Sequence, residues 1–168
     1  MSSTYARLYV HLVWATKLRT RWITPALAPR LHGLLSSRCR ALQCVALAVG
    51  GVEEHVHVLV GLHPSVAVAD LVRELKTNSS GFMHDECGVD AFAWQEGYGA
   101  FTLRDTELDT VREYIHNQPA HHDAASLVTE WERVGPPRGV RCAIGRGAMR
   151  ASLVTPCATL DCVGCGSR

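Results

Sequence analysis

The chain has 168 residues, of which 47% are hydrophobic and 20% charged, and its formal net charge at pH 7 is +1. This composition is typical of one ordinary globular domain with a real core. No apolar stretch reaches the roughly 18 residues of a membrane-spanning helix, and the first ten residues lack the pattern of a secretory signal. We therefore expect a cytoplasmic protein whose seven cysteines include no disulfide framework.

Charge is distributed unevenly along the chain. Residues 1–52 hold seven basic side chains and no acid, residues 53–132 hold fifteen acids and four bases, and residues 133–168 hold six arginines and one acid. A basic block suits a polyanionic partner, but it can equally be a solvated face that the acidic middle balances after folding. Charge alone leaves both interpretations open.

Hydrophobic periodicity predicts alternating strands and helices along the chain. In chain order the pattern predicts a strand over 4–16, a helix over 25–41, strands over 44–52 and 55–62, a helix over 66–84, one or two strands within 91–103, and a helix over 105–118. The first six elements match the split βαβ, ferredoxin-like arrangement, an α+β fold with an antiparallel sheet and helices on one face. The last element adds a C-terminal helix.

The pattern decays beyond about residue 133. The sequence there is rich in Gly, Pro, Arg and Cys and has no sustained periodicity, which is typical of a segment with little fixed structure. We therefore predict one domain over 1–132 and a poorly ordered tail over 133–168. The tail has one C-x₂-C spacing, at Cys162 and Cys165, and no second one to pair with it, so we do not expect a zinc site there.

Two histidines stand one residue apart in the apolar strand expected over 55–62. Because side chains alternate along a strand, His55 and His57 project from one face with Cα atoms about 6.6 Å apart, close enough to bind one metal ion. An isolated H-x-H pattern is more often one exposed and one hydrogen-bonded histidine. The pair therefore needs support from elsewhere in the chain.

The helix expected over 105–118 supplies that support. Tyr114 and Gln118 lie four residues apart, so they occupy one helical face, beside the apolar stripe of Val111 and Ile115. One rigid element could thus deliver a phenol nucleophile and a carboxamide ligand. The alternative is that Tyr114 only packs, with its hydroxyl in water.

At this point the chain resembles a known family, the single-tyrosine HUH transposases of the insertion sequence 200/605 group, together with the REP-associated tyrosine transposases. The stretches that carry the resemblance, in order between residues 5 and 122, are "YVHLVWATKLR", "EEHVHVLVGLHPS", "LVRELKTNSSGFMH", "FAWQEGYGAF" and "VREYIHNQPAHH". An ordered set of spaced motifs is far more specific than any single one.

The resemblance implies a catalytic site and its chemistry. It implies that Tyr114 attacks a DNA phosphodiester and that His55, His57 and Gln118 bind a divalent metal. Such enzymes cut single-stranded DNA beside hairpins at the ends of a mobile element, form a 5′-phosphotyrosine, and rejoin the strands. They act as homodimers in which the tyrosine helix of one subunit completes the histidine site of the other. The mixed nitrogen and oxygen ligands suit Mn²⁺, although cellular abundance can favour Mg²⁺.

Further residues are candidates for contact with DNA. The resemblance at "LKTNSS" makes Lys76 a candidate phosphate contact, with a solvated helix lysine as the equal alternative. Basic residues near the start could follow the DNA backbone: Arg7, Lys17, Arg19 and Arg21.

Two other functions fit parts of the pattern. A replication or conjugation nickase would use the same histidine chemistry, but such chains usually carry larger accessory domains. A non-catalytic nucleic-acid-binding module would use the same kind of sheet, because ferredoxin-like sheets resemble RNA-recognition folds.

Overall fold

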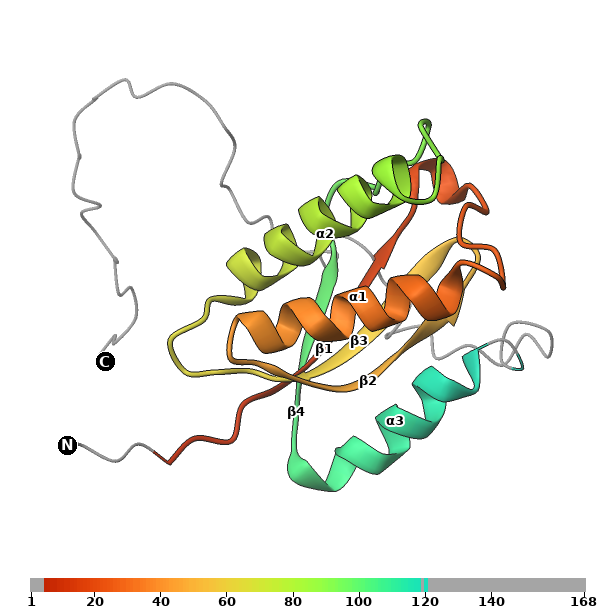
Figure 1. Cartoon of the computed structure of the whole chain (residues 1–168). Helices are drawn as coiled ribbons and strands as arrows, with labels where there is room; N and C mark the ends of the chain where they lie inside the picture. Colours follow the sequence, from red (N-terminus) through yellow and green to blue (C-terminus); the bar gives the residue numbers. More distant parts are fainter. Residues whose placement is uncertain (1–4, 119, 121–168) are drawn as a thin grey trace, which may run out of the picture.

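The computed structural model of the protein describes residues 5–118 and residue 120. The predicted domain boundary after residue 132 and the predicted tail over 133–168 lie outside these residues. Within them the chain forms an α+β fold with the order of elements that the periodicity predicts (Figure 1).

Four antiparallel strands form one sheet in the order β2-β3-β1-β4. The strands are β1 (Tyr9–Ala15), β2 (Val45–Val52), β3 (His55–Gly61) and β4 (Gly99–Leu103). The central pair β1 and β3 is therefore not consecutive in the chain, and each outer strand pairs with one of them. This topology confirms the predicted ferredoxin-like, split βαβ arrangement.

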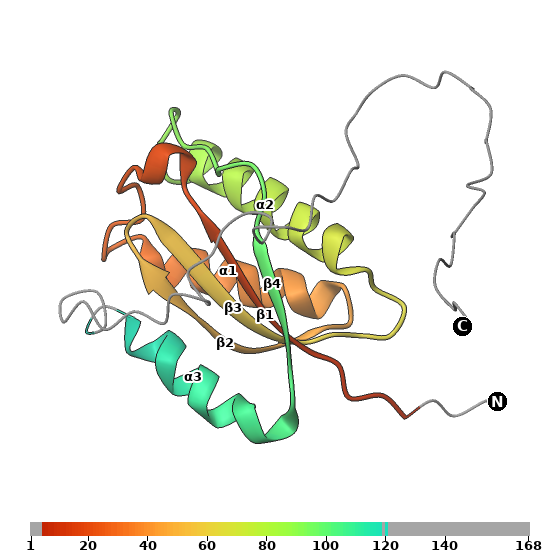
Figure 2. The ribbon, with the colours of Figure 1, turned by 180° about the vertical axis from the view of Figure 1, so that it is seen from behind.

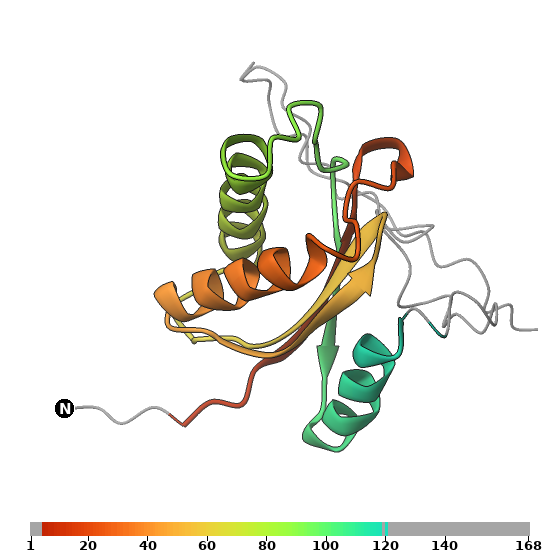
Figure 3. The same cartoon turned by 45° about the vertical axis from the view of Figure 1, so that its right-hand side comes forward.

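The helices divide between the two faces of the sheet (Figure 3). The helices α1 (Ala28–Ala41) and α2 (Val68–Asp85) cover one face, and α3 (Leu108–His116) lies against the other. Figure 2 shows the sheet from behind, with α1 beyond the strands and α3 beside β2. The C-terminal helix thus stands apart from the two helices that the ferredoxin-like unit itself contributes.

The main hydrophobic core lies between the sheet and the pair α1 and α2. Alternate strand residues supply one side of it and the apolar stripes of the two helices supply the other. Its fully buried members include Leu12, Trp14, Val56, Val58, Leu31, Leu35, Leu71 and Leu75. Side chains alternate along a strand, so the strand residues between these core positions point to the face that α3 covers.

The stretch 91–103, where one or two strands are predicted, contains the strand β4 over Gly99–Leu103. Gly97 has a φ of +80°, a left-handed conformation that turns the chain out of the ladder. Lys76 of α2 also bonds to the backbone there: its Nζ donates to the carbonyls of Gln95 at 2.8 Å and Gly97 at 2.6 Å. Trp94 keeps a single bridge to Thr16.

The helix predicted over 105–118 is shorter in the structure. A 3₁₀ turn over Asp105–Glu107 precedes α3, and the Glu107 carboxylate accepts the backbone N–H of Arg104 at 2.8 Å. This bond lowers the pKa of Glu107. Gln118 lies two residues beyond the last residue of α3.

Two expectations from the sequence can be compared with the described residues. The described cysteines Cys39, Cys44 and Cys87 are free thiols, and burial raises the pKa of Cys39 to about 12. None of the helices that the structure describes is long and apolar enough to cross a membrane.

Candidate active site between α3 and the sheet

The two histidines of β3 lie on the sheet face that α3 covers. Alternation along β3 sends Val56 and Val58 into the main core, so His55 and His57 point to the opposite face. Their ring centroids are 4.9 Å apart, with the rings nearly perpendicular, and both side chains are fully buried. The structure therefore confirms that the H-x-H pattern places two imidazoles side by side.

The end of α3 brings Tyr114 and Gln118 to the same place. The Tyr114 ring lies edge-on to His57, with centroids 5.9 Å apart. His55 Nε2 is 3.2 Å from Gln118 Oε1. All four residues that the resemblance singles out thus converge, and they do so within one chain.

A small apolar cluster and one glycine seat α3 on the sheet. Val111 and Ile115 of α3 pack on Ala48 of β2 and Leu59 of β3. Gly50 of β2 pairs in register with His57, and a Cβ at Gly50 would lie only 2.4 Å from the carbonyl oxygen of Ile115. The close approach of α3 therefore depends on the missing side chain at residue 50.

A third buried imidazole, His11 of β1, joins this cluster and was not among the predicted site residues. Its Nε2 lies 2.9 Å from Nδ1 of His57, and the two rings are close to parallel, with an interplanar angle of 21° and centroids 5.1 Å apart. The sequence holds a weak indication, a histidine within the otherwise apolar stretch "YVHLVWA". Only the pairing of β1 with β3 brings it next to His57.

The donor set of the cluster fits a divalent metal ion. Two ligands of one octahedral ion, each about 2.1 Å from it, lie about 3 Å apart, which is close to the 3.2 Å between His55 Nε2 and Gln118 Oε1. A carboxamide oxygen suits both Mg²⁺ and Mn²⁺, and the two imidazole nitrogens make the mixed set better suited to Mn²⁺. The described residues include no cluster of three His, Cys, Asp or Glu side chains placed to hold a metal, so a site here needs the Gln118 amide.

Glu54 and its ion-pair partner Arg19 lie next to the histidine pair. Glu54 Oε1 lies 4.0 Å from Nδ1 of His55 and 2.5 Å from Nη1 of Arg19. A carboxylate thus faces the side of His55 that points away from Gln118.

Three of the four basic residues proposed to follow DNA are ion-paired in the structure. Arg7 pairs with Asp105, Arg19 with Glu54, and Arg21 with Glu53 at 3.5 Å. The fourth, Lys17, is exposed in the 3₁₀ turn Lys17–Arg19. Exposed ion pairs are weak, so a phosphate could replace these carboxylates.

Lys76 has contacts that point to a structural role. Its two hydrogen bonds hold the loop before β4, and burial lowers its pKa. The helix α2 that carries it covers the sheet face opposite α3 (Figure 3). The structure does not bring Lys76 to the histidines.

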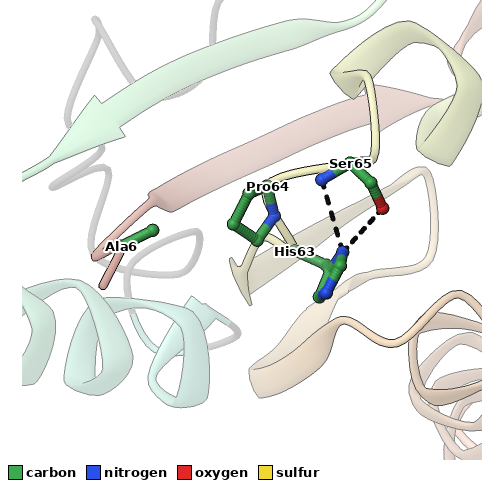
Figure 4. A pocket seen from close by; sticks show the side chains of 4 residues that line it. All are labelled: Ala6, His63, Pro64 and Ser65. Atoms are coloured by element: carbon green, nitrogen blue, oxygen red, sulfur yellow. Dashed lines mark hydrogen bonds between the residues drawn. The ribbon is translucent and has the colours of Figure 1, made fainter. Parts of the chain in front are cut away.

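One surface hollow, lined by Ala6, His63, Pro64 and Ser65, lies away from this cluster (Figure 4). His63 follows the end of β3, whereas His55 begins it. Within the hollow, Nδ1 of His63 accepts the backbone N–H of Ser65 at 3.3 Å and lies 2.7 Å from its Oγ. The hollow contains none of the proposed site residues.

Comparisons with known proteins give the family and the fold of the chain. The sequence model of the family described as "Transposase IS200 like" matches residues 4–118. The fold is similar to a candidate transposase from Deinococcus radiodurans R1, with 24% identity, a TM-score of 0.55, and coverage of 70% of this chain and 95% of that one. It is also similar to a REP-associated tyrosine transposase bound to a REP hairpin, with 20% identity, a TM-score of 0.53, and coverage of 78% and 80%. No curated protein matches the chain.

Proposed function

Because the chain belongs to the family of IS200-like transposases, we propose that it cuts and rejoins single-stranded DNA at the hairpin-flanked ends of a mobile element. The observation that carries the proposal is the meeting of Tyr114 and Gln118 with His55 and His57 on one sheet face. The structural neighbour bound to a REP hairpin supports a DNA hairpin as the substrate.

In the proposed reaction the phenolic oxygen of Tyr114 attacks the phosphorus of a DNA phosphodiester. The bond from phosphorus to the 3′-oxygen breaks, the phenol loses its proton, and the departing 3′-oxygen gains one. Tyr114 then carries the 5′-phosphate and the DNA ends in a free 3′-hydroxyl. A 3′-hydroxyl later attacks the phosphotyrosine, which restores the phenol and rejoins a strand. One phosphoester replaces another at each step, so no ATP is needed.

His55, His57 and Gln118 would hold the divalent metal, Mg²⁺ or Mn²⁺. A phenol with the ordinary pKa of about 10 is a weak nucleophile at neutral pH. When bound, the ion would withdraw charge from the scissile phosphate and orient it for in-line attack. The burial of the three side chains strengthens such an electrostatic effect, because the surrounding dielectric is low.

The DNA strand would reach the site past the basic residues of the N-terminal block. Lys17, Arg19 and Arg21 lie in or beside the turn that contacts Glu53 and Glu54, directly before His55. Arg7 would contact the DNA at the other end of β1. Lys76 would contact it only if its hydrogen bonds to the loop before β4 were broken. Phosphates would replace the carboxylates now paired with the arginines.

A covalent adduct with DNA tests the nucleophile. Purified protein is incubated with a single-stranded hairpin oligonucleotide and Mn²⁺, and a protein–DNA adduct is sought on a denaturing gel. We expect an adduct with the wild type and with Tyr5→Phe, which alters an exposed tyrosine (82% exposed), and none with Tyr114→Phe. An adduct that persists in Tyr114→Phe would refute the assignment. No adduct in the wild type would favour the non-catalytic nucleic-acid-binding function.

The proposal includes a homodimer in which α3 of one subunit completes the histidine site of the other. In such an exchange Val111 and Ile115 would pack on β2 and β3 of the partner subunit, as they pack on β2 and β3 of their own chain in this structure. Mixing inactive Tyr114→Phe with inactive His57→Ala tests this point, since only an exchanged dimer unites an intact tyrosine with an intact histidine pair. We expect the mixture to regain adduct formation. Continued inactivity would show that each chain completes its own site.

A further inference from the structure

We propose that His11 is a positioning residue that fixes which nitrogen of His57 is available to a metal ion. The inference rests on the proposed function, because it takes His57 as a metal ligand. It concerns a side chain that the motifs of the family resemblance leave without a role.

The sheet register places His11 beside His57. In the antiparallel pair of β1 and β3, Val13 is opposite His57 and His11 is opposite Leu59. His11 and His57 are therefore diagonal neighbours on the α3 face, within reach of each other's long side chains. His11 is fully buried.

Contacts with two other rings hold the His11 ring. The His57 ring meets it edge to edge, with an interplanar angle of 21° and 2.9 Å between the two nitrogens. Phe101 of β4, which is opposite His11 in the register, lies with its ring centroid 5.9 Å from that of His11. An imidazole fixed in this way presents its nitrogen to His57 in one direction.

The 2.9 Å contact between His11 Nε2 and His57 Nδ1 allows two proton arrangements. If Nδ1–H of His57 donates to Nε2 of His11, then Nε2 of a neutral His57 carries a lone pair and can bind a metal. If Nε2–H of His11 donates instead, a neutral His57 carries its proton on Nε2 and cannot bind a metal there. His11 therefore acts as the acceptor, because only that arrangement agrees with ligation by His57.

The nearest charged group to Nδ1 of His55 is the Glu54 carboxylate at 4.0 Å, beyond hydrogen-bond distance. The 2.9 Å contact with His11 is therefore the outer hydrogen bond of the histidine pair that the geometry supports. Such outer hydrogen bonds fix the tautomer and orientation of metal-binding histidines, and removing one typically weakens metal binding about 10-fold to 100-fold.

Three variants separate positioning from packing. His11→Phe keeps a planar ring of similar size and removes the acceptor. His11→Gln keeps an acceptor, because its Oε1 can replace Nε2. His84→Phe is the matched control: His84 belongs to α2, the helix on the sheet face opposite α3 (Figure 3), and its Nε2 lies 2.7 Å from the Phe92 carbonyl oxygen.

The first measurement needs no metal. Long-range ¹H–¹⁵N spectra of the metal-free protein report which nitrogen of His57 carries the proton. We expect Nδ1–H in the wild type, in His11→Gln and in His84→Phe, and a shift of the proton towards Nε2 in His11→Phe. A wild-type His57 protonated at Nε2 would overturn the proposal whether or not the protein is a transposase.

The second measurement is Mn²⁺ affinity by calorimetry, with thermal unfolding recorded on the same samples. We expect about 10-fold to 100-fold weaker binding in His11→Phe and values near wild type in His11→Gln and His84→Phe. Unchanged affinity in a folded His11→Phe would refute the role of His11, and if that variant does not fold, loss of affinity in folded His11→Gln would refute it. If the wild type binds no Mn²⁺, the proposed metal site fails, and the metal-free spectra still decide the tautomer.

Discussion

A single methyl group at Gly50 tests whether the approach of α3 governs the chemistry. In Gly50→Ala the new Cβ would lie 2.4 Å from the Ile115 carbonyl oxygen and 2.9 Å from its Cγ2. Ordinary contacts of this kind begin at 3.4 Å, so α3 has to move away from β2 by about 1 Å. Residue 50 is paired with His57 in the register, so the displacement falls at the site itself.

The expected loss of rate follows from how strongly a reaction rate depends on the placement of the reacting groups. A displacement of about 1 Å can lower a rate by about 100-fold, because Tyr114 and Gln118 move with α3. Overpacking at the interface costs about 1–3 kcal/mol of stability. We therefore expect adduct formation in Gly50→Ala to slow by about 100-fold while the protein stays folded.

The assay is single-turnover adduct formation with hairpin DNA and Mn²⁺, together with urea unfolding. Gly33→Ala is the matched control, since Gly33 lies within α1 and nothing is within 4 Å of the position of an added Cβ. That change should leave the rate unaltered and stabilise the protein by about 0.5–1 kcal/mol. A wild-type rate in Gly50→Ala would refute the view that the seat of α3 on β2 sets the reactive geometry.

Three further predictions concern residues outside the seat of α3. Lys76→Met should lower the free energy of unfolding, measured in urea, by about 1–3 kcal/mol, because the carbonyls of the loop before β4 lose their charged donor. If the variant instead loses DNA affinity at unchanged stability, Lys76 is a phosphate contact. Arg19→Gln and Arg21→Gln should each reduce, by about 0.7, the slope of the logarithm of the binding constant for single-stranded DNA against the logarithm of salt concentration. The control Arg40→Gln, at an exposed position of α1, should leave this slope unchanged. Cys39, whose pKa burial raises to about 12, should resist alkylation in the folded protein at mildly alkaline pH and react after unfolding, as peptide mass spectrometry can show; rapid labelling of the folded protein would contradict its burial.

The pKa of Lys76 also has a consequence for stability. Burial lowers it in the folded state relative to the unfolded chain, so between the two values the unfolded chain binds more protons. Stability should therefore rise with pH over that window and be smaller below it. The hydrogen bonds of Nζ keep the lysine in place despite this cost.

Local patterns predicted the elements of the fold well where the periodicity was strong. The alternating strands around His55 and His57 and the apolar stripes of α1 and α2 appear at nearly the predicted residues. The stretch before β4 was less predictable, because a lysine on a distant helix takes up the backbone carbonyls there. Such a contact leaves no trace in the periodicity of either segment.

The sequence by itself determined which side chains share a face, because a strand repeats every two residues and a helix every 3.6. That was enough to predict His55 and His57 on one face of a strand and Tyr114 and Gln118 on one helical face, although Gln118 lies two residues beyond the end of α3. Only the tertiary structure decided that α3 lies opposite α1 and α2, that β1 separates β3 from β4, and that His11 consequently contacts His57. Faces follow from backbone dihedral angles within a segment, whereas neighbours across segments follow from strand order and from close packing at positions such as Gly50.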